Sequence, residues 1–422
     1  MKVDVEELGA CKRRLSIEET PEVVQKAWEQ AFTRVQREAR LPGFRKGKLP
    51  RSMVKLHFAD DVRQEVARQL IPDVYRQAIA ETQLKPVEEP DFQEVTLEEN
   101  AALRVSAVVE IKPRIALGAY TGLAVRHTPK PFEDTEVDEA LSHLREQHAE
   151  FRTVERAADL GDLVIIDYTI TPEGLPARTE SGHSFVVGGG SVYPQIEEAV
   201  IGLVPGGARE AHFRFPEDHR NEALRGKPAQ AQVKVIEVKE KVLPALDDDF
   251  ARTVGSFESL DGLRAELRTG LEKRREQENR RALEEAVVQA ALAAHEFAVP
   301  EAMVLRQVGA QIEHMKEGFR RNGMDPERVP WDYPKLLEEL RPGATATMRR
   351  LLLLEAIAEA EGFAPTAAEV DAEVERIAQA GQRPAPAVRR LMEQSGDLDA
   401  LRLSLRERKT VEFLVEHAQV TS

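Results

Sequence analysis

The chain has 422 residues, of which 42% are hydrophobic, 32% are charged and only 5% are aromatic. A formal net charge of −15 excludes a protein that coats nucleic acid through a general positive field, so any contact with RNA must be local. The length is too great for one ordinary core and predicts about three domains.

Two further features favour a cytoplasmic protein that has no membrane partner. The leucine run at residues 351–354, like every other purely apolar run, is far shorter than the roughly 20 residues that a membrane-spanning helix needs. The first residues lack the apolar core of a signal peptide, and the single cysteine, Cys11, excludes an internal disulfide framework.

The first 112 residues predict an α+β domain. Alternating apolar residues around a glycine predict a hairpin over residues 1–19, and a Thr-Pro start predicts a helix over residues 21–40. A second helix is expected over residues 51–82, with Pro72 as a kink or as the start of a new segment. Strand-like alternation over residues 103–111 predicts another strand.

A short segment between these two helices is rich in glycine and flanked by proline, which predicts an exposed turn. Its candidate binding residues are Gly43, Phe44, Arg45, Lys46, Gly47 and Lys48. An aromatic ring beside three cations suits a phosphate-rich surface or a mixed RNA and protein surface. The alternative is a solvated basic turn in which Phe44 tucks back onto its own domain.

The next segments predict a linker, a helix and a β-rich domain. Proline and glycine punctuate residues 113–131, and a narrow apolar stripe predicts a helix over residues 135–154. Residues 160–241 contain short β-branched runs separated by Gly/Pro turns, with one short helix over residues 195–201. His143 and His148 are expected to be solvated or packed, because no metal-binding pattern accompanies them.

Residues 243–422 predict an almost wholly helical region. Breaks at proline and glycine separate the expected helices, which cover residues 259–296, 300–322, 334–361, 366–381, 388–392 and 398–418. Several are long and poor in large apolar residues, which favours elongated arms over a dense bundle. A coiled-coil dimerisation region is the structural alternative, although no sustained heptad register supports it.

One face of the expected helix over residues 300–322 is a candidate surface for unfolded polypeptide. Its apolar side chains are Met303, Val308, Ile312, Met315 and Phe319. Flexible methionine side chains suit varied partners, whereas ordinary helix packing is the alternative explanation. The sequence contains no ATP-binding motif, so no cofactor is expected and release of a bound segment must be passive.

Several motifs together resemble one protein family. They are the run from Gly43 to Pro50, Gly161-Asp162, Asp167-Tyr168, Phe215-Pro216-Glu217 and the run from Leu243 to Phe250. In order and spacing they are similar to trigger factors, the ribosome-associated bacterial chaperones, and the resemblance covers nearly the whole chain. It implies an α+β multidomain fold with a ribosome-binding domain (1–112), a linker and helix associated with the chaperone region (113–154), an FKBP-type prolyl isomerase domain (155–242) and helical chaperone arms (243–422).

The resemblance also implies an isomerase pocket. It assigns to the pocket or its rim Tyr168, Phe185, Tyr193, Pro194, Ile196 and Phe215. Ala177 and Ile196 stand where the family usually has aromatic residues, and His219 stands where it often has tyrosine. We therefore expect a folded domain of weak activity, unless Tyr168 and Phe185 are only core residues.

By resemblance, the partners are the large ribosomal subunit near the polypeptide exit and nascent, unfolded or exported polypeptides. Whether free molecules form a homodimer is left open. Two alternatives remain at this point: a free-standing FKBP-type isomerase with helical targeting arms, and an RNA-binding ribosome assembly factor. The altered pocket counts against the first alternative, and the acidic total charge counts against the second.

Overall fold

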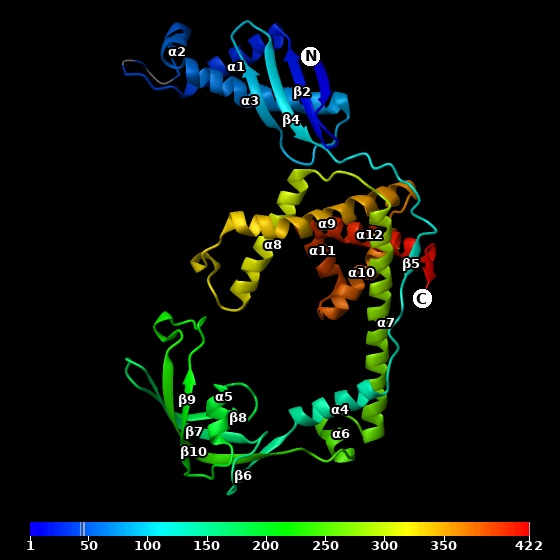
Figure 1. Ribbon diagram of the computed structural model, residues 1–422. Helices are drawn as coiled ribbons and strands as arrows, with labels where there is room; N and C mark the ends of the chain where they lie inside the picture. The colour runs from blue at the N-terminus through cyan, green and yellow to red at the C-terminus, as the bar shows by residue number, and fades with distance from the viewer. Residues whose placement is uncertain (43, 45–46, 422) are drawn as a thin grey trace. The chain divides into compact units, whose positions relative to one another are not determined.

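The computed structural model describes residues 1–42, 44 and 47–421 (Figure 1). The chain forms two compact units, one made of Met1–Thr128 with Arg281–Ser422 and one made of Pro129–Arg280. The predicted α+β multidomain class is confirmed, with an N-terminal α+β region, a β-rich middle region and a helical C-terminal region. The predicted boundaries after residues 112, 154 and 242 stay predictions.

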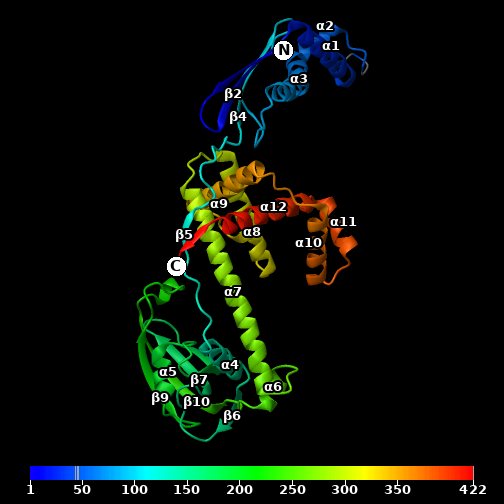
Figure 2. The same cartoon turned by 90° about the vertical axis from the view of Figure 1, so that its right-hand side faces the viewer.

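The N-terminal region packs helices on one face of an antiparallel sheet (Figure 2). In sheet order the strands are β1 (Lys2–Glu7), β2 (Lys12–Glu19), β4 (Leu103–Glu110) and β3 (Asp91–Thr96). The helices are α1 (Pro21–Glu38), α2 (Arg51–His57) and α3 (Ala59–Thr82). Alternate residues of the strands, such as Leu15 and Val105, face the helices and pack with Trp28 and Val66 in one core.

The predicted single helix over residues 51–82 is wrong in one respect. The helical path breaks at Phe58, whose φ of −131° is not helical, so that two helices form. Phe58 is half-buried and packs against the core of the N-terminal region, a tertiary contact that the helical period does not reveal. Pro72 lies inside α3 without ending it, on an exposed part of the helix where water can reach the carbonyl that loses its partner.

The helical region is a set of helices joined by short turns. They are α7 (Leu260–Ala293), α8 (Glu301–Arg321), α9 (Tyr333–Ala360), α10 (Ala367–Ala380), α11 (Ala385–Ser395) and α12 (Asp397–Glu416), with a short 3-10 turn at Pro326–Arg328. Their apolar residues form several separate clusters rather than one continuous seam. Thr366 and Glu369 form a capping box that starts α10, and the Lys409 ammonium lowers the pKa of Glu369 to about 2.

The linker contains a strand that the sequence did not predict. Strand β5 (Ala124–Arg126) pairs in parallel with β11 (Gln419–Thr421), so residues almost 300 positions apart share a two-stranded sheet. Val125 is buried beside Val287, Leu353 and Leu414, which come from three different helices. This part of the linker is therefore a component of the helical region's core.

The second unit contains a twisted half-barrel. Its strands are β6 (Glu150–Val154), β7 (Leu163–Pro172), β8 (Arg178–Val186), β9 (Ala208–Arg214) and β10 (Pro228–Val242), and its helices are α4 (Thr135–Gln147), α5 (Pro194–Val200), α6 (Asp248–Val254) and the 3-10 turn Glu222–Leu224. Strand β10 pairs along most of its length with β7, and its two halves pair with β9 and β6.

The predicted helix over residues 135–154 is too long. It ends at Gln147, and Glu150–Val154 forms strand β6 against residues 238–242 of β10. A helical reading of this stretch fails because its backbone hydrogen bonds are made with a strand about 90 residues later in the chain.

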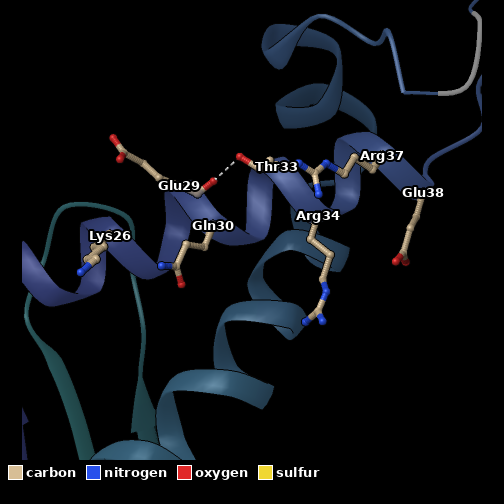
Figure 3. A pocket seen from close by; sticks show the side chains of 7 residues that line it. All are labelled: Lys26, Glu29, Gln30, Thr33, Arg34, Arg37 and Glu38. Atoms are coloured by element: carbon tan, nitrogen blue, oxygen red, sulfur yellow. Dashed lines mark hydrogen bonds between the residues drawn. The ribbon is translucent and has the colours of Figure 1, made fainter.

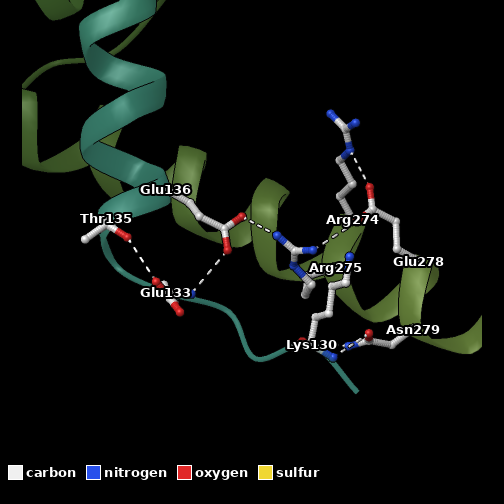
Figure 4. Close-up of polar contacts among 8 residues, drawn as sticks. All are labelled: Lys130, Glu133, Thr135, Glu136, Arg274, Arg275, Glu278 and Asn279. Carbon is white, nitrogen blue, oxygen red and sulfur yellow. Dashed lines mark hydrogen bonds and ion pairs between the residues drawn. The ribbon is translucent and has the colours of Figure 1, made fainter. Parts of the chain in front are cut away.

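Helix α4 and the segment before it are fastened to α7 by polar contacts (Figure 4). Asn279 exchanges two hydrogen bonds of 2.9 Å with the backbone of Lys130. The Arg275 guanidinium lies 2.8 Å from Glu136 and lowers the pKa of that carboxyl group. An apolar cluster that includes Leu141, Phe250 and Leu263 lies beside these contacts.

Within the described part of the chain, no helix combines the length and the apolar character that crossing a membrane requires.

Candidate functional site

The residues predicted for the isomerase pocket lie together in the half-barrel. Tyr168 is on β7, Phe185 is on β8, and Ile196 is in the first turn of α5. Phe185, Ile196 and Phe215 are buried, whereas Tyr168 and Tyr193 are half-buried, and all five belong to one apolar cluster. The structure therefore brings together residues that are separated by up to 47 positions in the sequence.

Stacked and edge-on rings form one wall of this cluster. Tyr193 stacks on Phe213 at a centroid distance of 4.5 Å and meets Phe215 edge-on at 5.6 Å. The His219 ring also meets Phe215 edge-on, at 5.3 Å. Such arrangements are favourable for aromatic rings and hold Tyr193 in place at the edge of the cluster. Phe213 is part of this wall and was not among the predicted site residues.

A hydrogen-bonded group of three side chains, Tyr168, Glu180 and His183, lies at the border of the same apolar cluster. The Tyr168 hydroxyl donates to Glu180 Oε2 at 2.5 Å, and His183 Nδ1 lies 2.9 Å from Glu180 Oε1. The His183 ring meets Tyr168 edge-on at 5.6 Å. Burial, with Glu180 as a second cause, raises the pKa of Tyr168 to about 12, so the phenol is neutral and donates its proton.

The same hydrogen bonds also change the pKa of the Glu180 carboxyl group. Tyr168 first and His183 second lower the pKa of Glu180, which is therefore ionised at neutral pH. Sequence reasoning did not identify Glu180 or His183. The signal lies in the sheet register, because Tyr168 is directly opposite Glu180 across β7 and β8.

Two of the expected aromatic positions have different surroundings. Ile196 is 1% exposed and contributes an aliphatic side chain to the cluster. Ala177 is exposed just before β8 and contributes no ring. The predicted weakness of the isomerase activity stays a prediction.

The segment between α1 and α2 displays part of its predicted binding set. Phe44 is 41% exposed, so it is not fully buried in its own domain. Gly47 has a φ of +75°, a conformation that favours glycine, and Lys48 is exposed. Gly43, Arg45 and Lys46 lie outside the described residues.

The neighbouring Leu49 anchors this segment. Its side chain is 1% exposed in the core, and its carbonyl accepts a hydrogen bond of 2.5 Å from Gln36 on α1. Phe44 and Lys48 therefore stand on a segment that is attached at one end to the core.

The outer face of α1 carries a shallow groove with mixed charge (Figure 3). It is lined by Lys26, Glu29, Gln30, Thr33, Arg34, Arg37 and Glu38. Arg34 pairs with Glu65 of α3 at 2.5 Å and lowers the pKa of that carboxyl group. Because carboxylates alternate with the cations, this groove suits polyanions less well than the segment before α2 does.

The predicted polypeptide-binding residues of α8 divide into two groups. Met303, Val308 and Ile312 are buried against neighbouring helices, where they have the ordinary packing role. Met315 and Phe319 are half-buried, and Phe319 meets Trp331 edge-on at 5.6 Å. The helical pattern located the apolar face of α8 but could not show which part of it α9 covers.

A mostly apolar groove of about 520 Å³ remains open between α8 and α9. It is lined by Gln307, Ala310, Gln311, His314, Met315, Glu339, Leu340 and Gly343. Met315 is the one predicted binding residue in this lining. The Gln311 side-chain oxygen is buried and has no hydrogen-bond partner.

These regions define a class of protein: a modular α+β protein that carries a β-rich half-barrel and a helical region. Among the described residues, no cluster of side chains could hold a metal ion.

Comparison with known proteins gives the family. Residues 1–144 match the family model for "Bacterial trigger factor protein (TF)", and residues 259–416 match the model for its C-terminus. The trigger factor of Moorella thermoacetica is 35% identical over 99% of this chain and 95% of its own length. That of Carboxydothermus hydrogenoformans is 36% identical over 99% of this chain and its full length. The chain belongs to the trigger factor family.

A solved structure supports the same fold over the whole length. It is described as "Promiscuous Substrate Recognition in Folding and Assembly Activities of the Trigger Factor Chaperone" and covers 99% of each chain with a TM-score of 0.52 and 20% identity. Full-length membership of the family gives this chain the trigger factor chaperone function and an FKBP-type domain. It favours the chaperone over the free-standing isomerase and the RNA-binding assembly factor.

Proposed function

We propose that this chain is an ATP-independent cytoplasmic chaperone that docks on the large ribosomal subunit through residues 43–48 and holds nascent or exported polypeptides. The exposed ring of Phe44, in a locally cationic segment of a chain with net charge −15, is the observation that carries the docking part. Screening over about 8 Å at cellular salt lets such a segment attract a polyanion despite the acidic remainder.

Co-sedimentation with purified ribosomes tests the docking part. We expect the full chain to sediment with ribosomes and the triple variant Phe44→Ala, Arg45→Ala, Lys46→Ala to remain in the supernatant. The matched control changes Phe92, Arg104 and Lys2 to alanine, since these are also one exposed ring and two exposed cations of the same domain. If the wild type and the first variant bound ribosomes equally well, the assignment of residues 43–48 as the docking segment would be wrong.

The proposed domain boundaries follow the sequence motifs. Residues 1–112 dock, residues 113–154 and 243–422 form the chaperone body, and residues 155–242 form the isomerase domain. Because β6 pairs with β10, an excision of the middle domain must include residues 150–154 if it is to leave no unpaired strand. We expect a chain that lacks residues 150–242 to suppress aggregation of a heat-denatured client, and loss of protection would locate the holding activity elsewhere.

The second part of the proposal is weak prolyl isomerisation in the half-barrel pocket. The barrier is the resistance of the amide to twisting, about 18–20 kcal/mol, so no nucleophile or base is needed. An apolar site lowers it by withholding water from the planar, polar ground state, and the ring wall around Tyr193 and Phe215 supplies such a site. A proline tetrapeptide assay is expected to show slow turnover that increases in Ile196→Phe; turnover equal to that of an efficient isomerase would contradict it.

The third part places client contacts in the groove between α8 and α9. Met315 and Leu340 offer apolar contact there. Burial of such patches contributes about 25 cal/mol per Å² and is largely offset by association entropy, so binding should be weak and fast. We expect Met315→Lys to weaken client binding, whereas the exposed control Leu403→Lys on α12 leaves it unchanged.

The last part of the proposal concerns the oligomeric state of molecules that are not bound to ribosomes. Pairing into a homodimer away from ribosomes would appear as a doubled mass in analytical ultracentrifugation, and a single monomeric species over the cellular concentration range would exclude it.

A further inference from the structure

Three consecutive glycines, Gly188, Gly189 and Gly190, lie in the turn between β8 and α5 of the half-barrel. The φ angles of Gly188 and Gly190 are +85° and +69°, a region that favours glycine. At Gly189 a Cβ atom would lie 2.9 Å from the Val186 carbonyl oxygen, which is closer than side chains approach a backbone oxygen. The backbone of this turn therefore requires glycine at all three positions.

The turn directs two backbone N–H groups at one carboxylate. The Gly188 N–H group donates to Glu197 Oε2 at 3.1 Å, and the Gly190 N–H group donates to Glu197 Oε1 at 2.9 Å. Glu197 lies in the first turn of α5 and is half-buried. Since hydrogen bonds to an ionised acceptor are stronger than those between neutral groups, this carboxylate fastens the turn to α5. The two N–H groups, which could otherwise bind an external anion, are thus occupied by the protein's own carboxylate.

The turn that Glu197 fastens leads directly to the aromatic wall. Tyr193 is the N-cap residue of α5, three positions after Gly190, and no side-chain hydrogen bond caps the helix there. Its ring stacks on Phe213 and meets Phe215 edge-on. Because the ring is only half-buried, packing does not enclose it on all sides, and its position also depends on the backbone that carries it.

We propose that Glu197 is a positioning residue of the isomerase pocket. By holding the turn of three glycines against α5, its carboxylate keeps the Tyr193 ring where the proline of a client is bound. The inference rests on the proposed isomerase function. Glu197 takes no part in the chemistry, because twisting of the amide needs no acid or base. It acts on the shape of the site, and therefore on the affinity for the proline segment.

Kinetics of the full chain with a proline tetrapeptide test this role. In Glu197→Gln one carboxylate oxygen becomes an NH2 group, which cannot accept a hydrogen bond, so only one of the two glycine N–H groups keeps its partner. We expect KM to rise about tenfold while kcat changes less than about twofold, since a displaced wall removes binding that the ground state and the transition state share. Glu198→Gln is the matched control and should have wild-type kinetics, because Glu198 is the next residue of α5 and is exposed.

A double-mutant cycle separates positioning from a merely structural role. If Glu197 acts through Tyr193, then Glu197→Gln should raise KM in the wild-type background but not in Tyr193→Ala. Equal increases in both backgrounds would overturn the inference, whatever happens to the melting temperature. Hydrogen exchange in the wild-type chain is a second measurement that needs no variant. The Gly188 and Gly190 amides should exchange slowly, and unprotected amides would also overturn the inference.

The kinetic measurement also distinguishes this inference from the function on which it rests. If the wild type isomerises the peptide and Glu197→Gln has the wild-type KM, the positioning role is wrong and the isomerase proposal stands. If the wild type shows no turnover at all, the isomerase proposal fails, and the positioning role fails with it.

Discussion

The proposed docking segment and the proposed aromatic pocket use their side chains in opposite ways. In the pocket, Phe185, Ile196 and Phe215 are buried by residues from several strands and a helix, so the site is also part of a core. Near the docking segment, Leu49 and Val54 hold the backbone while Phe44 and Leu56 remain exposed. A site that belongs to a core changes stability when it is altered, whereas an exposed site changes only binding, and each prediction below tests this difference.

The largest effect is expected in the pocket wall. Phe213→Ala removes a ring that is 7% exposed and stacks on Tyr193, and it should lower the free energy of unfolding of the middle domain by about 3–5 kcal/mol. Chemical denaturation followed by circular dichroism measures this loss, while ribosome binding should stay unchanged. A loss below about 1 kcal/mol would show that the wall is not part of the core.

The second effect concerns binding alone. Phe44→Ala should weaken ribosome binding about tenfold or more, because an exposed ring in a cationic segment is a typical interface anchor. Its melting temperature should equal that of the wild type, since the ring is absent from the N-terminal core. A marked fall in melting temperature would contradict the contrast with the pocket.

The third effect is a shift in titration. Glu180→Gln should move the pKa of Tyr168 down from about 12 but not fully to its ordinary value near 10, because burial is the larger cause and remains. Ultraviolet titration measures the shift, with Tyr168→Phe subtracted to remove the other tyrosines. Since the folded-state pKa lies above the unfolded one, the stability that Tyr168 contributes is present below about pH 10 and is lost as the pH rises towards 12. An unchanged pKa of Tyr168 in Glu180→Gln would show that the Glu180 carboxylate does not contribute to the shift.

The smallest effect is expected at Arg51. Its guanidinium lies over the Phe32 ring, so Arg51→Ala should lower the stability of the N-terminal region by about 0.5–1 kcal/mol. The same change should reduce the salt dependence of ribosome binding, since one cation is lost. Arg51→Lys is the control that keeps the charge, and equal salt dependence in both variants would place Arg51 outside the interface.

Much of the fold was visible in the sequence because local signals agree with it. Thr20-Pro21 starts α1 where predicted, Thr366 caps α10, and the alternation of residues 103–111 corresponds to β4. The failures come from partners that are distant in the chain. Strand β6 forms because its backbone pairs with that of β10. The helix breaks at Phe58 because the ring of this residue packs against the core.

The sites show the same limit. Glycine and proline predicted the exposed segment between α1 and α2, and resemblance predicted the aromatic residues of the pocket; both assignments as functional sites stay predictions. The link from Tyr168 to Glu180 and His183 depends on strand register, which no local pattern supplies. On α8, periodicity identified Met303 and Met315 as members of one apolar face, but only the position of α9 shows that the first is buried and the second lines a groove.

The pairing of β5 with β11 has a consequence for how this molecule is itself made. Residues 124–126 leave the site of synthesis long before residues 419–421 exist, and the whole second unit is translated between them. At about 5–20 residues per second, the first partner waits for roughly tens of seconds. The half-barrel can therefore fold while the surrounding unit is still incomplete, and the growing chain exposes Val125 and the apolar faces of its later helices during that interval. During its own synthesis this chaperone therefore exposes apolar surface of the kind that a chaperone binds.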